Sequence, residues 1–149
     1  EHELPEYFIL LQPTSPFRNW RHIQLCVKSF YASNASCCIS VTEAEHHPYK
    51  AFIMRHNGLQ PLLDKGTLSK PRQKLPKIFR QNGAIYLMSS KLFLKKNAFY
   101  ASPALPFMMD AKESLDIDMP HDLAVAEALS KDIDRENKYS IDHAFKRAL

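Results

Sequence analysis

The sequence contains few glycines and no glycine-rich loop. Among its 149 residues are three glycines, Gly58, Gly66 and Gly83, which are well separated and all lie beyond the first strand expected below. A loop that cradles phosphate groups with backbone amides needs closely spaced glycines, because side chains would hold the phosphates away from the amides. We therefore expect no complete phosphate-binding loop in this sequence.

Membrane spans, cysteine-based metal sites and hydrolytic triads are also missing. No apolar run approaches the ~18 residues of a membrane helix, and no signal peptide is recognisable. Cys26, Cys37 and Cys38 lack the CxxC spacing of zinc sites, so we expect free thiols in a reducing compartment. The adjacent His46 and His47 cannot share one face of a helix or strand, which favours a surface or interface pair over zinc ligation. We predict a soluble, cytoplasmic protein without hydrolytic covalent catalysis.

The composition is that of one globular domain of ordinary size. Hydrophobic residues make up 45% of the chain and charged residues 24%, which are average values. Lysine and arginine number 20 against 16 aspartates and glutamates, a net charge of +4. This modest excess suits anionic small ligands and nucleic acid about equally. Basic and aromatic residues are not interleaved in a repeated pattern, so we do not expect nucleic-acid binding.

The chain begins with a pattern typical of an α/β fold. Phe8 to Leu11 is an apolar run without polar alternation, which predicts a strand covered on both faces, as in the middle of a parallel sheet. Asn19 is placed to cap a helix whose apolar positions recur at i, i+3, i+4 and i+7. These positions are Ile23, Cys26, Val27 and Phe30. Residues 36–41 then predict a second short strand.

Residues 43–80 predict an arm that extends from the core. Prolines punctuate this stretch, basic residues are frequent, and the apolar segments are short. Such a segment has too little apolar surface to form a core of its own. We therefore expect it to pack on another surface.

Further elements are expected after the arm. The pattern predicts a strand at 83–88, a helix at 90–97, a short strand at 115–118 and a helix at 120–130. Pro120 suits the first turn of the last helix, with Leu123, Ala126 and Leu129 facing inward. The chain thus divides into a main part at 1–130, the arm inserted into it, and a charged tail at 131–149 to which we assign no function.

Asp116 and Asp118 are candidates for a metal site. On a strand, residues spaced by two project from the same face, and here they lie just before a helix. Mg²⁺ prefers such carboxylate oxygens and completes its shell with substrate phosphates and water. The alternative is a helix cap beside a solvated acid.

Polar side chains directly after the first strand are candidates for sugar binding, because open α/β sheets bind ligands where their strands end. Gln12, Thr14 and Ser15 can donate and accept hydrogen bonds, while Pro13 and Pro16 stiffen the loop and reduce the entropy lost on binding. The alternative is a turn that caps the following helix.

Arginines and aromatic residues supply further candidates. Arg72 and Arg80 can pair bidentately with a carboxylate or phosphate, and their alternative is a solvated basic surface. Tyr86, Phe99 and Tyr100 can wall a sugar pocket, with core packing as the alternative.

Four separated motifs, taken together, resemble the acylneuraminate cytidylyltransferases, which are also called CMP-sialic acid synthetases. The motifs are Gln12-Pro-Thr-Ser-Pro-Phe-Arg18, Glu45-His-His-Pro-Tyr-Lys50, Pro71-Arg-Gln-Lys-Leu-Pro-Lys-Ile-Phe-Arg-Gln-Asn-Gly-Ala-Ile-Tyr86 and Leu115-Asp-Ile-Asp-Met-Pro-His-Asp-Leu123. They run in the family's order, from about Phe8 to about Leu129, and resemble its C-terminal part. The resemblance implies a Rossmann-like nucleotidyltransferase fold with a mostly parallel sheet, of which the N-terminal, nucleotide-binding half is absent.

The resemblance also implies a reaction and a site. The parent enzyme would transfer CMP from CTP to a nonulosonic (sialic-type) acid, release pyrophosphate, and use Mg²⁺ on Asp116 and Asp118. Asp116, Asp118 and Gln12 would be catalytic. The substrates would be bound by polar, basic and aromatic residues, namely Gln12, Thr14, Ser15, Pro16, Lys50, Arg72, Arg80, Asn82, Tyr86, Phe99 and Tyr100. Phe99-Tyr100 departs from the two phenylalanines common in the family, so the acyl pocket would differ there.

The resemblance further implies a homodimer, in which the arm carries Lys50 and Arg72 to the partner's sugar site. Neither nucleic acid nor a membrane is an expected partner. Sialic, legionaminic and pseudaminic acids stay open as substrates, whereas an eight-carbon sugar acid is disfavoured by the Gln12 motif.

A non-catalytic alternative stays open. The chain alone is expected to be inactive, and it could be a dimerisation and sugar-acid-binding remnant of a truncated synthetase. The coding sequence upstream of Glu1 distinguishes the two, because an enzyme needs a strand and a basic, glycine-containing loop there.

Overall fold

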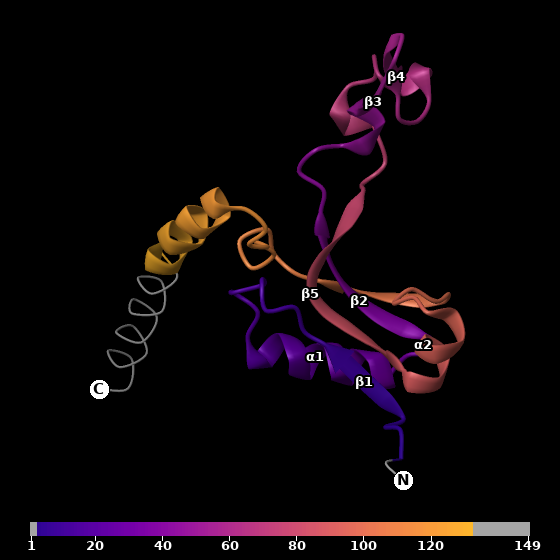
Figure 1. Cartoon of the computed structure of the whole chain (residues 1–149), viewed down its shortest axis with the longest axis vertical. Helices are drawn as coiled ribbons and strands as arrows, with labels where there is room; N and C mark the ends of the chain where they lie inside the picture. Colours follow the sequence, from indigo (N-terminus) through magenta and orange to yellow (C-terminus); the bar gives the residue numbers. More distant parts are fainter. Residues whose placement is uncertain (1–2, 133–149) are drawn as a thin grey trace.

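The structure is a computed structural model that describes residues 3–132. Its main body is a four-stranded sheet in the order β1-β5-β2-β6, with β1 at Tyr7–Leu10, β5 at Phe79–Ser89, β2 at Cys37–Glu43 and β6 at Ala104–Met108. Within the described residues, β1 and β6 are the edges of this sheet (Figure 1).

The sheet is mixed, which confirms the α/β class and corrects the prediction of a mostly parallel sheet. Strand β5 runs antiparallel to both of its neighbours, β1 and β2, and only β2 and β6 are parallel. The reason is the arm: the chain leaves the body from β2 and returns along β5 as a long hairpin, so β5 enters between β1 and β2 in the opposite direction (Figure 1). A Rossmann-like fold is consistent with this sheet and stays a prediction.

Helix α1, Trp20–Tyr31, confirms the helix expected after the first loop. The Asn19 side chain accepts hydrogen bonds from the backbone N–H groups of Arg21 and His22, and the His22 ring accepts the Asn19 N–H. This reciprocal cap satisfies amides that have no partner within the helix. Cys26 and Phe30 are buried, and Ile23 and Val27 pack against the same cluster, as the apolar spacing predicted.

Apolar side chains cover both faces of the sheet, so the strands are apolar without alternation. One core cluster joins α1 to the sheet and contains Cys26, Phe30, Cys38, Ala84, Ile85, Leu87 and Met109. The other lies on the opposite side and contains Cys37, Ile39, Tyr86, Met88 and Ala101, with Phe8, Leu10, Phe93 and Phe99 packed against it. The continuous apolar runs at 8–11 and 83–88 therefore reflect burial from two sides.

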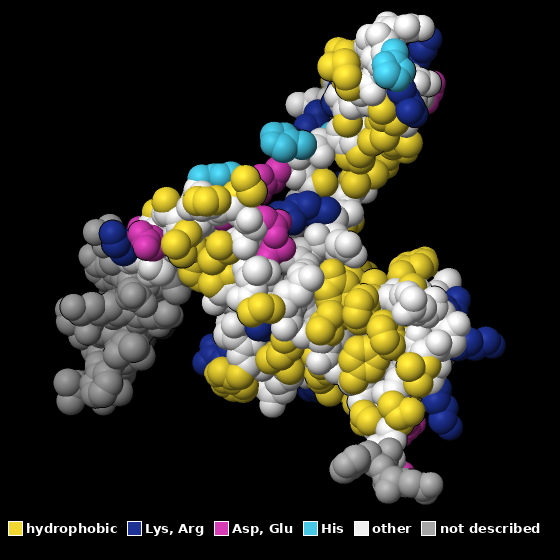
Figure 2. Space-filling model, in the orientation of Figure 1, with side chains coloured by type: hydrophobic (Ala, Val, Ile, Leu, Met, Phe, Trp, Pro, Cys, Tyr) yellow, Lys and Arg dark blue, Asp and Glu magenta, His cyan; other side chains and the backbone are white. Residues whose placement is uncertain are grey.

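Residues 44–78 between β2 and β5 project away from the body (Figure 1). They form a two-stranded sheet of β3, Phe52–Arg55, and β4, Gly58–Pro61, with short 3-10 turns at Pro48–Lys50, Lys65–Thr67 and Arg72–Lys74. Hydrophobic side chains lie along one side of this arm (Figure 2). The exposed hydrophobic residues of the arm include Phe52, Met54, Leu59, Leu62 and Leu63. Hence, in the described chain, the arm leaves apolar surface uncovered.

Two elements differ from the sequence prediction. Residues 115–118 are not part of a strand, so the short strand predicted there is wrong. Strand β6 was not expected, because Pro106 lies in its middle; a proline is tolerated there since β6 is an edge strand.

The expected helices at 90–97 and 120–130 are present with small changes. Helix α2 spans Ser90–Lys96 and ends at Asn97 in a left-handed conformation. The last helix begins at Pro120 and continues through the last described residue, 132. Ala126 is buried as predicted, whereas Leu123 is 51% exposed and does not face inward in the described chain. The predicted tail lies outside the described residues from 133 onward. No described helix has the length and apolar character needed to cross a bilayer.

Replacing Asn19 by alanine should lower the free energy of unfolding by about 1 kcal/mol, because two helix N–H groups lose their acceptor. Chemical denaturation of the 149-residue chain measures this change. Asn34→Ala, at an exposed loop position after α1, is the matched control and should change stability by less. Equal effects of both substitutions would show that the cap is not a stabilising feature.

Candidate active site

An irregularity in β5 forms the centre of the candidate site. Ile39 of β2 pairs with Tyr86, but Val41 pairs with Gln81, so one residue of β2 faces four residues of β5. These four, residues 82–85, form a bulge in which Gly83 has φ +76°. The buried Ser40 hydroxyl accepts the Ile85 N–H at 2.7 Å and donates to the Ile85 carbonyl at 3.1 Å. A side chain thus replaces the backbone ladder that the bulge interrupts.

Gln12 and Asp116 meet at Gly83. A Cβ atom added to Gly83 would overlap the Gln12 side-chain oxygen and would lie 3.4 Å from Asp116 Oδ2. Two predicted catalytic residues, more than one hundred positions apart in the sequence, therefore approach the same glycine. Only a residue without a side chain leaves room for both, and the positive φ favours glycine as well.

Asp116 has an unsatisfied buried oxygen and lies near Tyr86. Its Oδ1 atom is buried without a hydrogen-bond partner. The pKa of Tyr86 is raised, first by burial and then by the negative charge of Asp116. Tyr86, which directly follows the bulge, is therefore within electrostatic range of Asp116.

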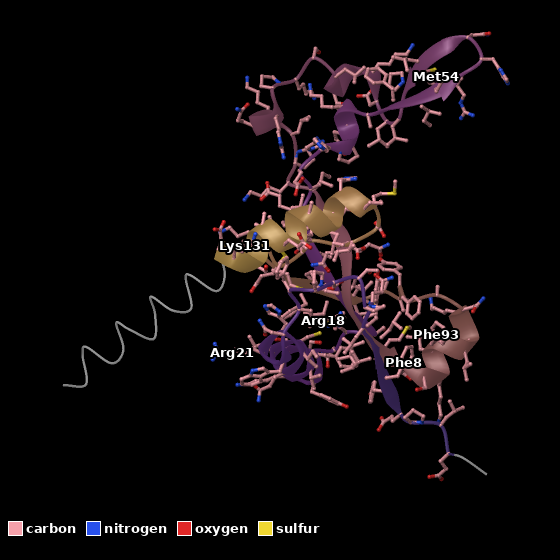
Figure 3. The ribbon with its side chains drawn as sticks, turned by 60° about the vertical axis from the view of Figure 1, so that its left-hand side comes forward. Phe8, Arg18, Arg21, Met54, Phe93 and Lys131 are labelled. Atoms are coloured by element: carbon pink, nitrogen blue, oxygen red, sulfur yellow. The ribbon has the colours of Figure 1, made fainter. Side chains whose placement is uncertain are left out.

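The loop after β1 is held against the bulge by Arg18. Its guanidinium Nη1 donates to the Gln12 carbonyl at 2.7 Å and to the Ala84 carbonyl at 3.0 Å. Figure 3 shows Arg18 inside the body, close to α1. Sequence reasoning placed Arg18 in a motif but gave it no role. The position of Arg18 could have predicted this role, because an arginine between a buried strand and a helix needs hydrogen-bond acceptors nearby.

Other residues of this loop border the Asp116 segment. The Thr14 carbonyl accepts the Ile117 N–H at 2.9 Å, which joins the loop to the residue between the two aspartates. Ser15 is buried and its hydroxyl has no partner. Pro16 is exposed. The predicted loop and the predicted acidic pair are therefore neighbours.

Asp118 differs from Asp116 because it is exposed. The following helix is capped by Asp122, whose Oδ2 accepts the N–H groups of Asp118 at 3.0 Å and Met119 at 2.7 Å. The pKa of Asp122 is held below its ordinary value, mainly by the hydrogen bond from the Met119 N–H. The cap considered for the acidic pair is thus supplied by Asp122. The described residues contain no group of three or more His, Cys, Asp or Glu side chains that could hold a metal ion.

The aromatic candidates separate. Phe99 lies 5.2 Å from Tyr86 between ring centroids, and its ring also contacts those of Phe8 and Phe93. Phe8 and Phe93 lie side by side (Figure 3). Tyr100 is 63% exposed. Phe99 and Tyr86 therefore pack together in the core cluster on this side of the sheet, as the core-packing alternative predicted, whereas Tyr100 is not part of this packing.

Asn82 is on the bulge but is buried, with an exposed fraction of 1%. Its amide contacts protein groups, the Ser114 hydroxyl at 2.8 Å and the Ala84 N–H at 3.2 Å. The contact of Asn82 with substrate stays a prediction. In the structure its side chain forms hydrogen bonds to other protein groups.

The basic candidates lie on the arm and at its base. Lys50 donates to the carbonyls of Leu68 and Lys70, and Arg72 donates to the Ala44 carbonyl at 2.9 Å. Arg72 lines two hollows of about 270 and 360 Å³ at the arm's base, and Lys50 lines the larger one. Arg80 is exposed on β5 and pairs with Thr42. In the described part of this chain, the hydrogen bonds given for Lys50 and Arg72 and the strand pairing of Arg80 do not involve Gln12, Gly83 or Asp116.

Comparison with known proteins identifies relatives. No family model matches the chain. An N-acylneuraminate cytidylyltransferase of Escherichia coli O18:K1:H7 is 32% identical over 145 residues, which cover 92% of this chain and 32% of the relative. A CMP-N,N'-diacetyllegionaminic acid synthase of Legionella pneumophila is 32% identical over 81% of this chain and 52% of the relative. A pseudaminic acid cytidylyltransferase of Campylobacter jejuni is 23% identical, over 88% and 56%.

The chain is homologous to these cytidylyltransferases. The resemblance inferred from the four motifs is thereby confirmed. The chain spans about a third to a half of the length of these relatives.

Gly83→Ala should destabilise the chain and displace Gln12. The positive φ costs about 1–2 kcal/mol for a residue with a side chain, and the overlap with Gln12 adds about 1 kcal/mol of overpacking. The matched measurement repeats the substitution in a Gln12→Ala background, where the overlap is absent and only the φ cost should remain. Identical losses of unfolding free energy in both backgrounds would contradict contact between Gln12 and Gly83.

Proposed function

We propose that this chain is part of a cytidylyltransferase that transfers CMP from CTP to a nonulosonic acid. The main supporting observation is that Gln12 and Asp116, from separate motifs, meet at Gly83 of the β5 bulge, and that Tyr86, the residue directly after the bulge, is close enough to Asp116 for its charge to raise the Tyr86 pKa. Homology to enzymes named for CMP transfer to such acids supports it. In the proposed reaction, the anomeric hydroxyl of the sugar acid attacks the α-phosphorus of CTP and forms a new P–O bond, while the P–O bond between the α-phosphorus and the leaving pyrophosphate breaks and the hydroxyl proton passes to solvent.

The loop after β1 supplies the sugar contacts in this proposal. Gln12, Thr14 and Ser15 orient sugar hydroxyls, and the partnerless Ser15 hydroxyl is available for such a bond. Arg18 keeps the loop in place by its two bonds to Gln12 and Ala84. Tyr86 and Phe99 form the apolar wall beside these polar groups. Preorganised contacts reduce the entropy lost when the substrate is ordered.

Asp116 and Asp118 fit a divalent cation. The buried Asp116 Oδ1 receives no hydrogen bond, as is expected of an oxygen reserved for a metal, and the exposed Asp118 leaves room for phosphates and water. Bound there, Mg²⁺ would neutralise charge that develops on the phosphates. Asp122 caps the following helix and thereby holds the backbone of Asp118.

Asp118→Asn should abolish CMP-sugar formation by the full-length gene product while leaving the fold intact, because it removes a metal-binding charge without changing volume. Pyrophosphate release at saturating Mg²⁺ measures the loss, and circular dichroism checks the fold. Asp110→Asn, another exposed aspartate before the same segment, is the control and should keep parental turnover. Turnover of Asp118→Asn near the parental rate would remove Asp118 from the site.

We also propose that the arm pairs with a second copy of the chain. Met54 and Leu59 are cross-strand partners in the arm's hairpin, yet they are 74% and 62% exposed. Apolar pairs of this kind are normally covered, and a second subunit would cover them. Lys50 and Arg72 would then complete the partner's site. This agrees with their hydrogen bonds within one chain, which are to carbonyls of the arm and its base and not to Gln12 or Asp116.

A mixing experiment tests this arrangement. Arg72→Ala and Asp118→Asn subunits of the full-length gene product should each be inactive, and their heterodimer should regain activity in one of its two sites, because one site collects both substitutions and the other neither. The rescued rate should approach about half that of the parent dimer. Absence of rescue, or a monomer in sedimentation, would contradict the shared site.

A further inference from the structure

Asn82 and Ser114 form a buried polar pair between the β5 bulge and the segment that carries Asp116. Each is 1% exposed. Asn82 Nδ2 donates to Ser114 Oγ at 2.8 Å, and Asn82 Oδ1 accepts the Ala84 N–H at 3.2 Å. One amide side chain therefore bonds to the bulge with its oxygen and to Ser114 with its nitrogen. Such a fully bonded buried amide fixes the distance between the groups it joins.

The Ser114 hydroxyl is fixed from both sides. It donates its single proton to the Met109 carbonyl at 3.4 Å and accepts the Asn82 N–H. The Ser114 backbone N–H donates to the Asp110 carbonyl at 3.0 Å. The turn between residues 110 and 114 is therefore closed at Ser114 and attached to the bulge at the same residue.

Asp116 lies between two attachments of its segment. On one side is Ser114, bonded to Asn82; on the other is Ile117, whose N–H donates to the Thr14 carbonyl at 2.9 Å. The segment is not part of a sheet, so it lacks the regular backbone bonds that hold β5. Sequence reasoning assigned Ser114 no role and treated Asn82 as a substrate contact.

We propose that Ser114, acting through Asn82, is a positioning residue that holds the Asp116 carboxylate against Gly83. The hydrogen bonds given for the Ser114 hydroxyl are to Asn82 and the Met109 carbonyl, so its effect on Asp116 passes through the backbone of residues 114–116. The effect of Ser114 on turnover rests on the proposed function. The effect of Ser114 on the position of Asp116 is independent of that function.

The structural half of the proposal is tested on the 149-residue chain by hydrogen exchange. Ser114→Ala removes the acceptor of the Asn82 amide, and the Ile117 N–H should then exchange about tenfold faster, because its segment is held at one end only. Ser114→Thr retains the hydroxyl and should retain slow exchange. Ser90→Ala is the matched control, since Ser90 is also buried but its hydroxyl has no partner. Unchanged exchange at Ile117 in Ser114→Ala would overturn the proposal.

The functional half is tested by a double-mutant cycle in the full-length gene product. Ser114→Ala should raise the Mg²⁺ concentration needed for half-maximal activity by about tenfold, the lower range for groups that orient a metal ligand, with the KM for the sugar acid nearly unchanged. In an Asn82→Ala background the same substitution should add little, because the bond is already lost. Additive effects, or an unchanged Mg²⁺ requirement, would overturn the positioning role. Faster Ile117 exchange in a protein whose parent makes no CMP-sugar would support the structural half and refute the proposed function.

Discussion

The bulge at residues 82–85 of β5 is the constraint on which the candidate site depends. If β2 and β5 paired regularly between Ile39 and Val41, a side chain of β5 would fill the space beside Gly83 that Gln12 and Asp116 occupy. The bulge instead places Gly83 there. The Ser40 hydroxyl bonds the Ile85 N–H and carbonyl in place of the backbone ladder that the bulge interrupts. Arg18, through the Ala84 carbonyl, and Asn82, through the Ser114 hydroxyl, then join two other segments to the same four residues. A local departure from sheet geometry thus assembles residues from distant parts of the chain.

Elements with strong local signals could be predicted from the sequence. The stripe and cap of α1, the apolar run of β1 and the core of β5 each depend on neighbouring residues, and the structure confirms these elements. The expectation that β1 lies in the middle of a parallel sheet was wrong for the described residues, because β1 is an edge strand and runs antiparallel to β5. The direction of β5 could not be predicted, because it is set by the return of the arm rather than by any pattern within the strand. For the same reason the sheet was expected to be mostly parallel. Pro106 concealed β6, since a proline counts against a strand unless its position at an edge is known.

The candidate site could be predicted in its residues but not in its geometry. Gln12, Tyr86 and Asp116 were identified from separate motifs, and the structure brings them together. Arg18 and Ser114 were missed, because Arg18 bonds a carbonyl 66 positions away, that of Ala84, and Ser114 bonds an amide 32 positions away, that of Asn82. Lys50 and Arg72 lie at the arm instead, so their predicted role depends on a second chain. The motifs therefore supplied candidate residues, and the folded chain shows which of these candidates lie together within one subunit.

The central claim is that the group around Gly83 belongs to a CMP-transferring site. The most direct measurement supplies the full-length gene product with CTP, Mg²⁺ and, separately, sialic, legionaminic, pseudaminic and eight-carbon sugar acids, and follows pyrophosphate together with CMP-sugar. The account predicts metal-dependent, equimolar formation of both products with at least one nine-carbon acid and none with the eight-carbon acid. A folded protein that releases no pyrophosphate with any of these acids would contradict it and would favour a non-catalytic, sugar-acid-binding module.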